Sequence, residues 1–184
     1  MSSKAATDTP IIWIDCEMTG IDPAKDEIME IACVVTDKNL EVIADGPNII
    51  IHKPDNILNN LSSWHIEHFT KTNLIEASRQ STISVQDAEK EVLTFLEKHT
   101  TAGTSPLAGN TIYMDRIFIN KEMPNLGKYC HYRLIDVSSV KELCNRWNKE
   151  IYNKQPKKKL MHRARDDIYE SIFELKYYKQ FMFK

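Results

Sequence analysis

Two acids inside an apolar run constrain the fold of this chain more than any other feature. The segment IIWIDCEMTG at residues 11–20 reads as a buried strand, and Asp15 and Glu17 interrupt it. Because side chains alternate across a strand, Trp13 and both acids face one side, with the two carboxylates about 6–7 Å apart. The nearly continuous hydrophobicity is typical of a central strand. Both carboxylates are therefore expected to meet in one space.

Two carboxylates in such a place need compensation. On a central strand, unpaired acids carry a cost of desolvation and of mutual repulsion, so a positive charge is expected between them. A different interpretation places the acids at a strand end or on an edge strand, where water solvates both, or pairs them with Lys or Arg. This segment alone does not decide between the two interpretations.

The rest of the chain shows strands first and helices later. The β-branched runs predict an antiparallel meander of three strands at 10–18, 28–37 and 41–51. Two short strands are expected at 105–110 and 132–137. Helical periodicity predicts helices near 62–77, 84–98, 111–121, 138–147 and 163–181. The predicted fold class is α/β, with a mixed five-stranded sheet flanked by helices.

Composition limits the size and the environment of the protein. With 184 residues, of which 42% are hydrophobic and 27% charged, the chain suits one domain over 1–184, with residues 1–9 as a flexible leader. The four cysteines form no C-x-x-C pair, so neither a zinc site nor a disulfide framework is indicated. No apolar run approaches the roughly 20 residues of a membrane span. We expect an intracellular protein without a membrane partner, in the cytoplasm or the mitochondrial matrix.

A third acid points inward from a predicted helix. In GNTIYMDRIFI, Ile112 and Ile119 mark the apolar stripe, and Asp115 falls on that stripe. The alternative is a solvated acid at the flank of the stripe, or one that interacts with the helix dipole.

The last predicted helix offers a fourth acid. Its inward face is marked by Ile168 and Ile172; Asp167 flanks that face, whereas Asp166 is expected to face solvent. His162 lies off this face and is expected to project from the loop before the helix.

Four carboxylates from three elements indicate a metal site. Oxygen ligands without thiolates or a histidine cluster are those that Mg²⁺ and Mn²⁺ prefer. Two such ions about 4 Å apart would stabilise the attacking and leaving oxygens of a phosphoryl transfer. His162 would then act as general base on a water molecule.

Four blocks of the sequence resemble a known family. WIDCEMTG, LAGNTIYMDRIF, HYRLIDVSSVKEL and HRARDDIYESI are similar, in order and spacing, to the blocks of the oligoribonucleases, DEDDh 3′→5′ exonucleases with a ribonuclease H-like fold. The resemblance implies that the metal ligands are Asp15, Glu17, Asp115 and Asp167, and that His162 is the general base. Arg165 departs from the family pattern, because an apolar residue is expected there.

The resemblance also implies a substrate pocket. Ile21 and Trp64 stand where relatives pack a leucine and a tryptophan against the terminal bases. The alternative for Trp64 is a core or helix-cap aromatic residue. Many relatives place a histidine five residues after the tryptophan, whereas this chain has Phe69 there, with His68 beside it.

A homodimer and a phosphate cap are implied as well. In relatives the tyrosine that matches Tyr132 reaches the active site of the partner subunit; the alternative is that Tyr129 and Tyr132 merely cover the sheet. The residues that match the cap on the substrate's 5′ phosphate are Thr111 from one subunit and Arg133, Ser138 and Ser139 from the other. The alternative for Arg133 is a surface ion pair with an acid such as Glu142.

The expected activity is 3′→5′ hydrolysis of very short single-stranded RNA, above all dinucleotides, to nucleoside 5′-monophosphates with two metal ions. A long cationic track is not expected, because 24 basic residues are outnumbered by 26 acids. Two alternatives remain open at this point: an exonuclease of the same catalytic type that trims DNA, and a catalytically silent RNA-binding module.

Overall fold

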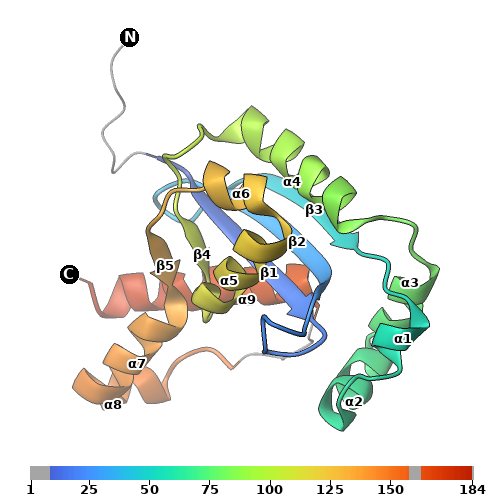
Figure 1. Cartoon of the computed structure of the whole chain (residues 1–184). Coiled ribbons are helices and arrows are strands. Elements are labelled where there is room, and N and C mark those ends of the chain that lie inside the picture. Colours follow the sequence, from blue (N-terminus) through green and yellow to red (C-terminus); the bar gives the residue numbers. More distant parts are fainter. Residues whose placement is uncertain (1–8, 158–162, 184) are drawn as a thin grey trace.

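The computed structural model describes residues 9–157 and 163–183. A five-stranded sheet lies at the centre, in the spatial order β3-β2-β1-β4-β5 (Figure 1). Its strands are β1 (Ile11–Met18), β2 (Ile28–Thr36), β3 (Val42–Ile50), β4 (Leu107–Gly109) and β5 (Leu134–Asp136). The expected mixed sheet is confirmed, and its central strand is β1, which carries the two acids.

The described helices surround this sheet. They are α1 (Asp55–Leu58), α2 (Ser63–Lys71), α3 (Leu74–Gln80), α4 (Val85–His99), α5 (Ile112–Glu122), α6 (Pro124–Tyr129), α7 (Val137–Trp147), α8 (Lys149–Asn153) and α9 (Ala164–Phe181). The four longer helices predicted after residue 83 are confirmed to within a residue at each end. The region expected as one helix at 62–77 is two, α2 and α3, because Asn73 between them adopts a left-handed φ of 59°. The short helices α1, α6 and α8 were not predicted.

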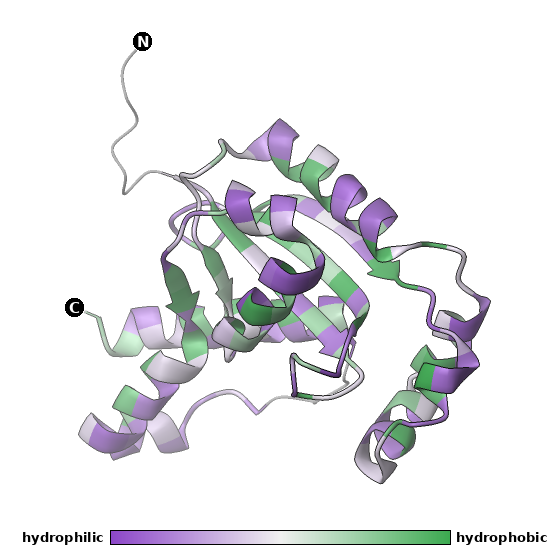
Figure 2. Cartoon of the chain, in the orientation of Figure 1, coloured by the Kyte–Doolittle hydropathy of each residue, from purple (hydrophilic) through white to green (hydrophobic). Residues whose placement is uncertain are grey.

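The strand pairing follows from the pattern of the sequence. β1, β2 and β3 pair antiparallel, which confirms the predicted meander. β4 and β5 follow helical crossovers and pair parallel, β4 with β1 and β5 with β4. Figure 2 shows hydrophobic residues concentrated on the strands and hydrophilic residues on the outer sides of the helices.

Each face of β1 packs against its own layer of helices. Ile12 and Ile14 belong to the core under α4, α5 and α6, whereas Trp13 belongs to the core under α7 and α9. The helices α5 and α9 lie on opposite sides of the sheet (Figure 1). The predicted alternation along β1 is therefore confirmed, and the face that carries Asp15 and Glu17 is the face covered by α9.

At the carboxyl end of β1, strand pairing is irregular on both sides of the strand. β4 pairs with β1 only at Ile12 and Trp13, so the edge of β1 beyond this point is not covered by a strand. On the other side, the β1–β2 register shifts after Glu17. The side chain of Met29 packs in a separate apolar cluster with α1, α2 and α3. Bulges of this kind re-aim side chains and are common beside active sites.

Two expectations concern the ends of the chain and membranes. The leader expected at residues 1–9 lies, apart from Thr9, outside the described residues. Among the helices that the structure describes, none combines the length and the apolar character needed to cross a membrane.

Candidate active site

Three carboxylates converge at the carboxyl end of β1. Asp15 and Glu17 project from the strand toward α9, and Asp167 stands in the first turn of that helix. Each offers one oxygen such that the three oxygens lie within 4.8 Å of one another. Asp166 is exposed, whereas Asp167 is half-buried. The structure thus brings together three of the four predicted ligands and agrees with the choice of Asp167 over its neighbour.

Asp115 approaches the same strand from the other side. It lies on the buried face of α5, with only 6% of its surface exposed, as its place on the apolar stripe predicted. Its Oδ1 accepts a hydrogen bond of 2.9 Å from the backbone N–H of Cys16. That N–H lies on the stretch of β1 that β4 leaves unpaired. Asp115 therefore supplies the acceptor that a neighbouring strand would otherwise provide. Asp115 is not a member of the three-residue group but adjoins it.

Burial and mutual repulsion raise the pKa values of these acids. Loss of hydration raises the pKa of Asp15 well above its usual value, and the charges of Asp115 and Glu17 raise it further. Burial, with the charges of Asp167 and Glu30, raises the pKa of Glu17 to about 8. Burial also raises the pKa of Asp115 to about 7, although the hydrogen bond from Cys16 lowers it. Without a cation, the site resists full ionisation near neutral pH.

The donor set fits a hard divalent ion. Neither Asp15 nor Glu17 forms an ion pair with Lys or Arg in the part of the chain that the structure describes. Both acids lie on the central strand, where water does not solvate them freely. The edge-strand and ion-pair alternatives are therefore not realised, although both acids do stand toward the carboxyl end of β1, where they are half-buried. Clustered carboxylate oxygens with raised pKa values are an arrangement that a bound cation stabilises.

A buried acid beside the site was missed by the sequence reasoning. Glu30 on β2 is the register partner of Glu17 and is fully buried. Unlike the site acids it is compensated, by Arg163 at 3.0 Å and by the amide of Asn48 at 2.9 Å. The signal was available in the segment IMEIACVV, where an acid interrupts an apolar strand just as in β1.

Ile21 stands on an exposed loop after β1. Its side chain is 75% exposed, which is unusual for isoleucine. The loop is held by Asp26, which accepts a hydrogen bond of 2.8 Å from the N–H of Asp22 and one of 3.2 Å from the hydroxyl of Thr19. A Cβ at Gly20 would lie 2.2 Å from the Asp26 carboxylate, so a larger residue there would displace the side chain that holds the turn. The loop therefore presents Ile21 outward.

Trp64 is likewise presented to solvent. It lies in the first turn of α2, is 49% exposed and stacks on His68 with ring centroids 4.0 Å apart. The alternative interpretation of Trp64 as a core residue is wrong. Phe69 is buried in the cluster of the small helices, so the position that departs from the family serves packing, and His68 is the ring beside Trp64.

The residues expected at the cap lie near the edge of the sheet. The hydroxyls of Thr111 and Ser138 are 3.1 Å apart within one chain, and Ser138 also bonds to Asn110. Ser139 is exposed. The short parallel pair β4–β5 explains the contact, because it brings both helix starts together.

Tyr132 and Arg133 project beside these hydroxyls. Tyr132 is 74% exposed and does not cover the sheet, whereas Tyr129 packs on the core and its hydroxyl contacts Thr100 at 3.0 Å. Arg133 lies over the Tyr132 ring, 5.4 Å from its centroid. The acid suggested as its alternative partner, Glu142, forms its ion pair with Arg146.

Two remaining expectations concern the loop before α9. His162 lies outside the described residues, so its role stays a prediction. Arg165, the departure from the family pattern, donates a 2.6 Å hydrogen bond to the carbonyl of Gly46 and lies 3.7 Å from the carboxylate of Asp45. The polar side chain is therefore used to attach α9 to the edge strand β3.

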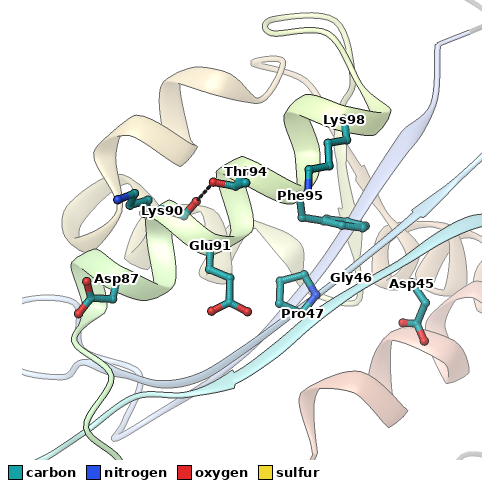
Figure 3. A pocket seen from close by; sticks show the side chains of 9 residues that line it. All are labelled: Asp45, Gly46, Pro47, Asp87, Lys90, Glu91, Thr94, Phe95 and Lys98. Carbon is teal, nitrogen blue, oxygen red and sulfur yellow. Dashed lines mark hydrogen bonds between the residues drawn. The ribbon is translucent and has the colours of Figure 1, made fainter.

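A pocket of about 470 Å³ lies elsewhere, between β3 and α4 (Figure 3). Pro47 and Phe95 form its apolar wall, and Lys90, Glu91 and Lys98 line it from the helix. None of the predicted site residues lines this pocket. The convergence of carboxylates on β1, and not this hollow, marks the candidate active site.

The fold and the acids define a class of protein. The family model described as "Exonuclease" (RNase_T) matches residues 12–175. The structure is similar to exonuclease I of E. coli solved with single-stranded DNA, with a TM-score of 0.75 and 16% identity over 95% of this chain and 41% of that one. Exonuclease I of Methylocaldum szegediense gives a TM-score of 0.67 at 15% identity, over 95% of this chain and 41% of that one. The chain is an exonuclease with a ribonuclease H-like fold.

Sequence relatives narrow the class. The mitochondrial oligoribonuclease of Homo sapiens is 50% identical over 174 residues, which cover 95% of this chain and 73% of the relative. The oligoribonuclease of Bordetella pertussis is 47% identical over 180 residues, with coverage of 98% and 99%. The chain belongs to the oligoribonuclease family of DEDDh exonucleases, as the four sequence blocks indicated, and this family is metal-dependent.

We expect the metal-free protein to lose stability as the pH rises from about 5 to about 8. In the unfolded chain Glu17 and Asp115 have pKa values of 4.5 and 3.8, whereas in the folded chain the values are about 8 and about 7. Over this interval the folded state holds protons that the unfolded state has released, so stability is full at low pH and falls as these groups ionise. Thermal unfolding in chelator at several pH values measures this, and a Tm that rose with pH in this window would contradict it.

The variant Asp15→Asn tests the cause of that instability. Removing one charge should raise the Tm of the metal-free protein near pH 8 by about 3 °C or more, the equivalent of roughly 1 kcal/mol in a chain of this size. Asp166→Asn is the matched control, because Asp166 is an exposed acid next to a site acid, and should leave the Tm within about 1–2 °C. Mg²⁺ should stabilise the parent protein and the control more than Asp15→Asn.

Proposed function

We propose that this protein hydrolyses very short single-stranded RNAs from the 3′ end, with dinucleotides as the preferred substrates, and releases nucleoside 5′-monophosphates. The observation that carries the proposal is the convergence of Asp15, Glu17 and Asp167 within 4.8 Å, on the fold of this exonuclease family. The names of the relatives, oligoribonucleases from animals and bacteria, support short RNA as the substrate.

The carboxylates would hold two divalent ions, Mg²⁺ or Mn²⁺. Asp15, Glu17 and Asp167 offer clustered oxygens, and Asp115 stands beside them with one oxygen already bonded to Cys16. Bound divalent ions supply positive charge that stabilises the attacking and leaving oxygens of a phosphoryl transfer. The rigid elements β1, α5 and α9 keep the acids in place despite their repulsion.

His162 is the proposed general base. It would accept a proton from the attacking water as the oxygen of that water bonds to phosphorus and the bond from phosphorus to the 3′ oxygen of the preceding nucleotide breaks. The departing 3′ oxygen takes a proton from solvent. A base of this kind works best with a pKa near the working pH, which the ordinary pKa of histidine satisfies.

Ile21 and Trp64 are the proposed contacts to the bases. Both are exposed, Ile21 on the loop after β1 and Trp64 in the first turn of α2, where it stacks on His68. Aromatic stacking of a base contributes about 1–3 kcal/mol and tolerates any sequence, so little base preference should result. The remaining substrate contacts must also be local, because the chain carries 24 basic and 26 acidic residues.

A cap at the 5′ phosphate would make the site selective for length. Arg133 presents a planar fork suited to phosphate, and Thr111, Ser138 and Ser139 offer hydroxyls. Thr111 of one subunit and Arg133, Ser138 and Ser139 of the other would form this cap; within one chain the hydroxyls of Thr111 and Ser138 lie 3.1 Å apart. A longer strand would have to continue through this cap.

A homodimer is part of the proposal. Tyr132 is 74% exposed at the start of the outermost strand β5, which fits a residue that reaches a partner's active site. We further propose that residues 1–184 form a single exonuclease domain, since the family model spans 12–175. An intracellular location, in the cytoplasm or the mitochondrial matrix, is supported by mitochondrial and bacterial relatives.

Substrate length is the sharpest test of the function. The kcat/KM for a 5′-phosphorylated RNA dinucleotide should exceed that for a ten-mer by about 10- to 100-fold, the effect of a charge-assisted hydrogen-bond set worth about 1.5–3 kcal/mol. Arg133→Ala should remove most of this preference, whereas Arg146→Ala, an exposed arginine on α7, should keep it. Quench-flow assays with Mg²⁺ or chelator, on RNA and DNA at matched ionic strength, supply the numbers. Equal kcat/KM for both lengths would remove the dinucleotide preference and leave the nuclease activity standing.

The variants Asp167→Asn and His162→Ala should lose activity for different reasons. Asp167→Asn should lower kcat by more than about 10³-fold and weaken Mn²⁺ binding, because a metal ligand is lost. His162→Ala should lower kcat by about 10²–10⁴-fold with Mn²⁺ affinity unchanged, as for loss of a general base. Asp166→Asn is the control for both and should be nearly fully active. Calorimetric Mn²⁺ titration separates the roles, and near-normal turnover of Asp167→Asn in saturating Mg²⁺ would rule out the assignment.

Mixing two variants, one impaired and one nearly inactive, tests the dimer. Tyr132→Ala should lower kcat/KM by about tenfold or more, consistent with loss of one stacked ring. If Tyr132 acts in the partner's site, adding excess Asp167→Asn protein should restore activity, because that variant supplies an intact Tyr132. Tyr169→Ala, another exposed tyrosine, is the control. Light scattering that finds an active monomer at the assay concentration would refute the dimer.

A further inference from the structure

Arg163 occupies a position for which its side chain is locally unsuited. It is the residue that precedes α9, where Ser, Thr, Asp or Asn is favoured because a side-chain oxygen can accept a free backbone N–H. A cation at this end also opposes the helix dipole. Arg163 forms no capping hydrogen bond. Local helix chemistry therefore does not explain the residue, and its tertiary contacts must.

Those contacts lead to a buried carboxylate. The Nε atom of Arg163 lies 3.2 and 3.3 Å from the two oxygens of Glu30, and Nη2 lies 3.0 Å from one of them. Glu30 is fully buried on β2, and the amide of Asn48 completes its hydrogen bonding at 2.9 Å. The remaining Nη1 donates to the carbonyl of Thr72, at the end of α2, at 3.5 Å. One guanidinium thus joins α9, the sheet and the small helices.

The backbone of Arg163 is bonded to the active site as well. Its carbonyl accepts the hydrogen bond from the N–H of Asp167 at 3.1 Å, which starts the helix. Glu30, to which its side chain is bound, is the register partner of Glu17. The same residue therefore links the neighbour of one predicted metal ligand to the main chain of another. In the sequence Arg163 directly follows His162, the predicted general base.

A second arginine strengthens the attachment of the same turn. Arg165 donates to the carbonyl of Gly46 at 2.6 Å and lies 3.7 Å from Asp45, both on β3 and both labelled in Figure 3. Ala164 between the two arginines is buried against the sheet. The first turn of α9 is thereby tied to two neighbouring strands.

We propose that Arg163 is a positioning residue of the active site: by binding Glu30 it fixes the first turn of α9, and so holds Asp167 against Asp15 and Glu17. The inference rests on the proposed function, because it gives Arg163 a role in that reaction. Without the tether, the turn could shift while the fold persists, and displacements near 1 Å at a catalytic centre lower rates by about 10²-fold.

A double variant separates positioning from stability. Arg163→Ala alone leaves the buried charge of Glu30 without its partner, so it should lower the Tm as well as kcat. Arg163→Ala/Glu30→Gln removes that charge and keeps an acceptor for Asn48, so the Tm should recover. The kcat on a 5′-phosphorylated RNA dinucleotide in saturating Mg²⁺ should nevertheless stay about 10- to 100-fold below the parent value, with KM changed by less than about threefold.

Two more variants complete the design. Arg163→Lys keeps the positive charge but loses the planar guanidinium that binds both oxygens of Glu30. This variant should fold stably and show an intermediate kcat. Arg79→Ala is the matched control, because Arg79 is also an arginine held by carboxylate, here by Asp55 and Glu76, and is 37% exposed against 33% for Arg163. It should lower the Tm slightly and leave kcat unchanged.

The outcomes distinguish the two proposals. A parent protein that cleaves the dinucleotide, together with a double variant and Arg163→Lys of parental kcat, would overturn the positioning role alone. A parent protein without activity on any short RNA would overturn the proposed function and this inference with it. A low kcat in the double variant at restored Tm is the result that a purely structural ion pair does not produce.

Discussion

The rest of this structure depends on the crowding of acids on its central strand. Asp15 and Glu17 share one face of β1, and burial with mutual repulsion raises the pKa values of both. Such a group is tolerated because β1 is locked between two apolar layers, Ile12 and Ile14 on one side and Trp13 on the other. The strand cannot turn its acids to solvent without exposing that core. The hydrophobic effect thus supplies the free energy that keeps like charges together.

Two carboxylates on adjacent strands, Glu30 and Glu17, show how the chain separates a structural acid from a functional one. Glu30 and Glu17 are register partners, yet Glu30 is satisfied by Arg163 and Asn48, whereas Glu17 has no ion pair with Lys or Arg among the described residues. An acid whose charge is balanced by an ion pair, as in Glu30, contributes to the fold. The half-buried Glu17, which lacks such a partner, calls for a cation from outside the chain, as a metal site provides.

The site is built from places where regular pairing stops. β4 leaves β1 after Trp13, which frees the N–H of Cys16 for Asp115. The shifted register after Glu17 sends Met29 into the cluster that supports α2 and its exposed Trp64. Irregular pairing at the carboxyl end of the central strand therefore accompanies both the acidic centre and the separate cluster on which α2 packs, while the regular half of the sheet holds β1 in place.

Periodic and local features of this protein could be predicted from the amino-acid sequence alone. Alternation in β1 and the apolar stripes of the long helices predicted the sheet, the face of the acids and the inward Asp115 and Asp167, because burial imposes these periods directly. The short helices escaped prediction: α6, for example, begins where buried Glu89 accepts the N–H groups of Asn125 and Leu126 at 2.6 and 3.0 Å. The tether from Arg163 to Glu30 spans 133 residues and leaves no periodic trace. Only the tertiary structure decided which acids are compensated, because the partner of a charge is set by proximity in space and not by spacing along the chain.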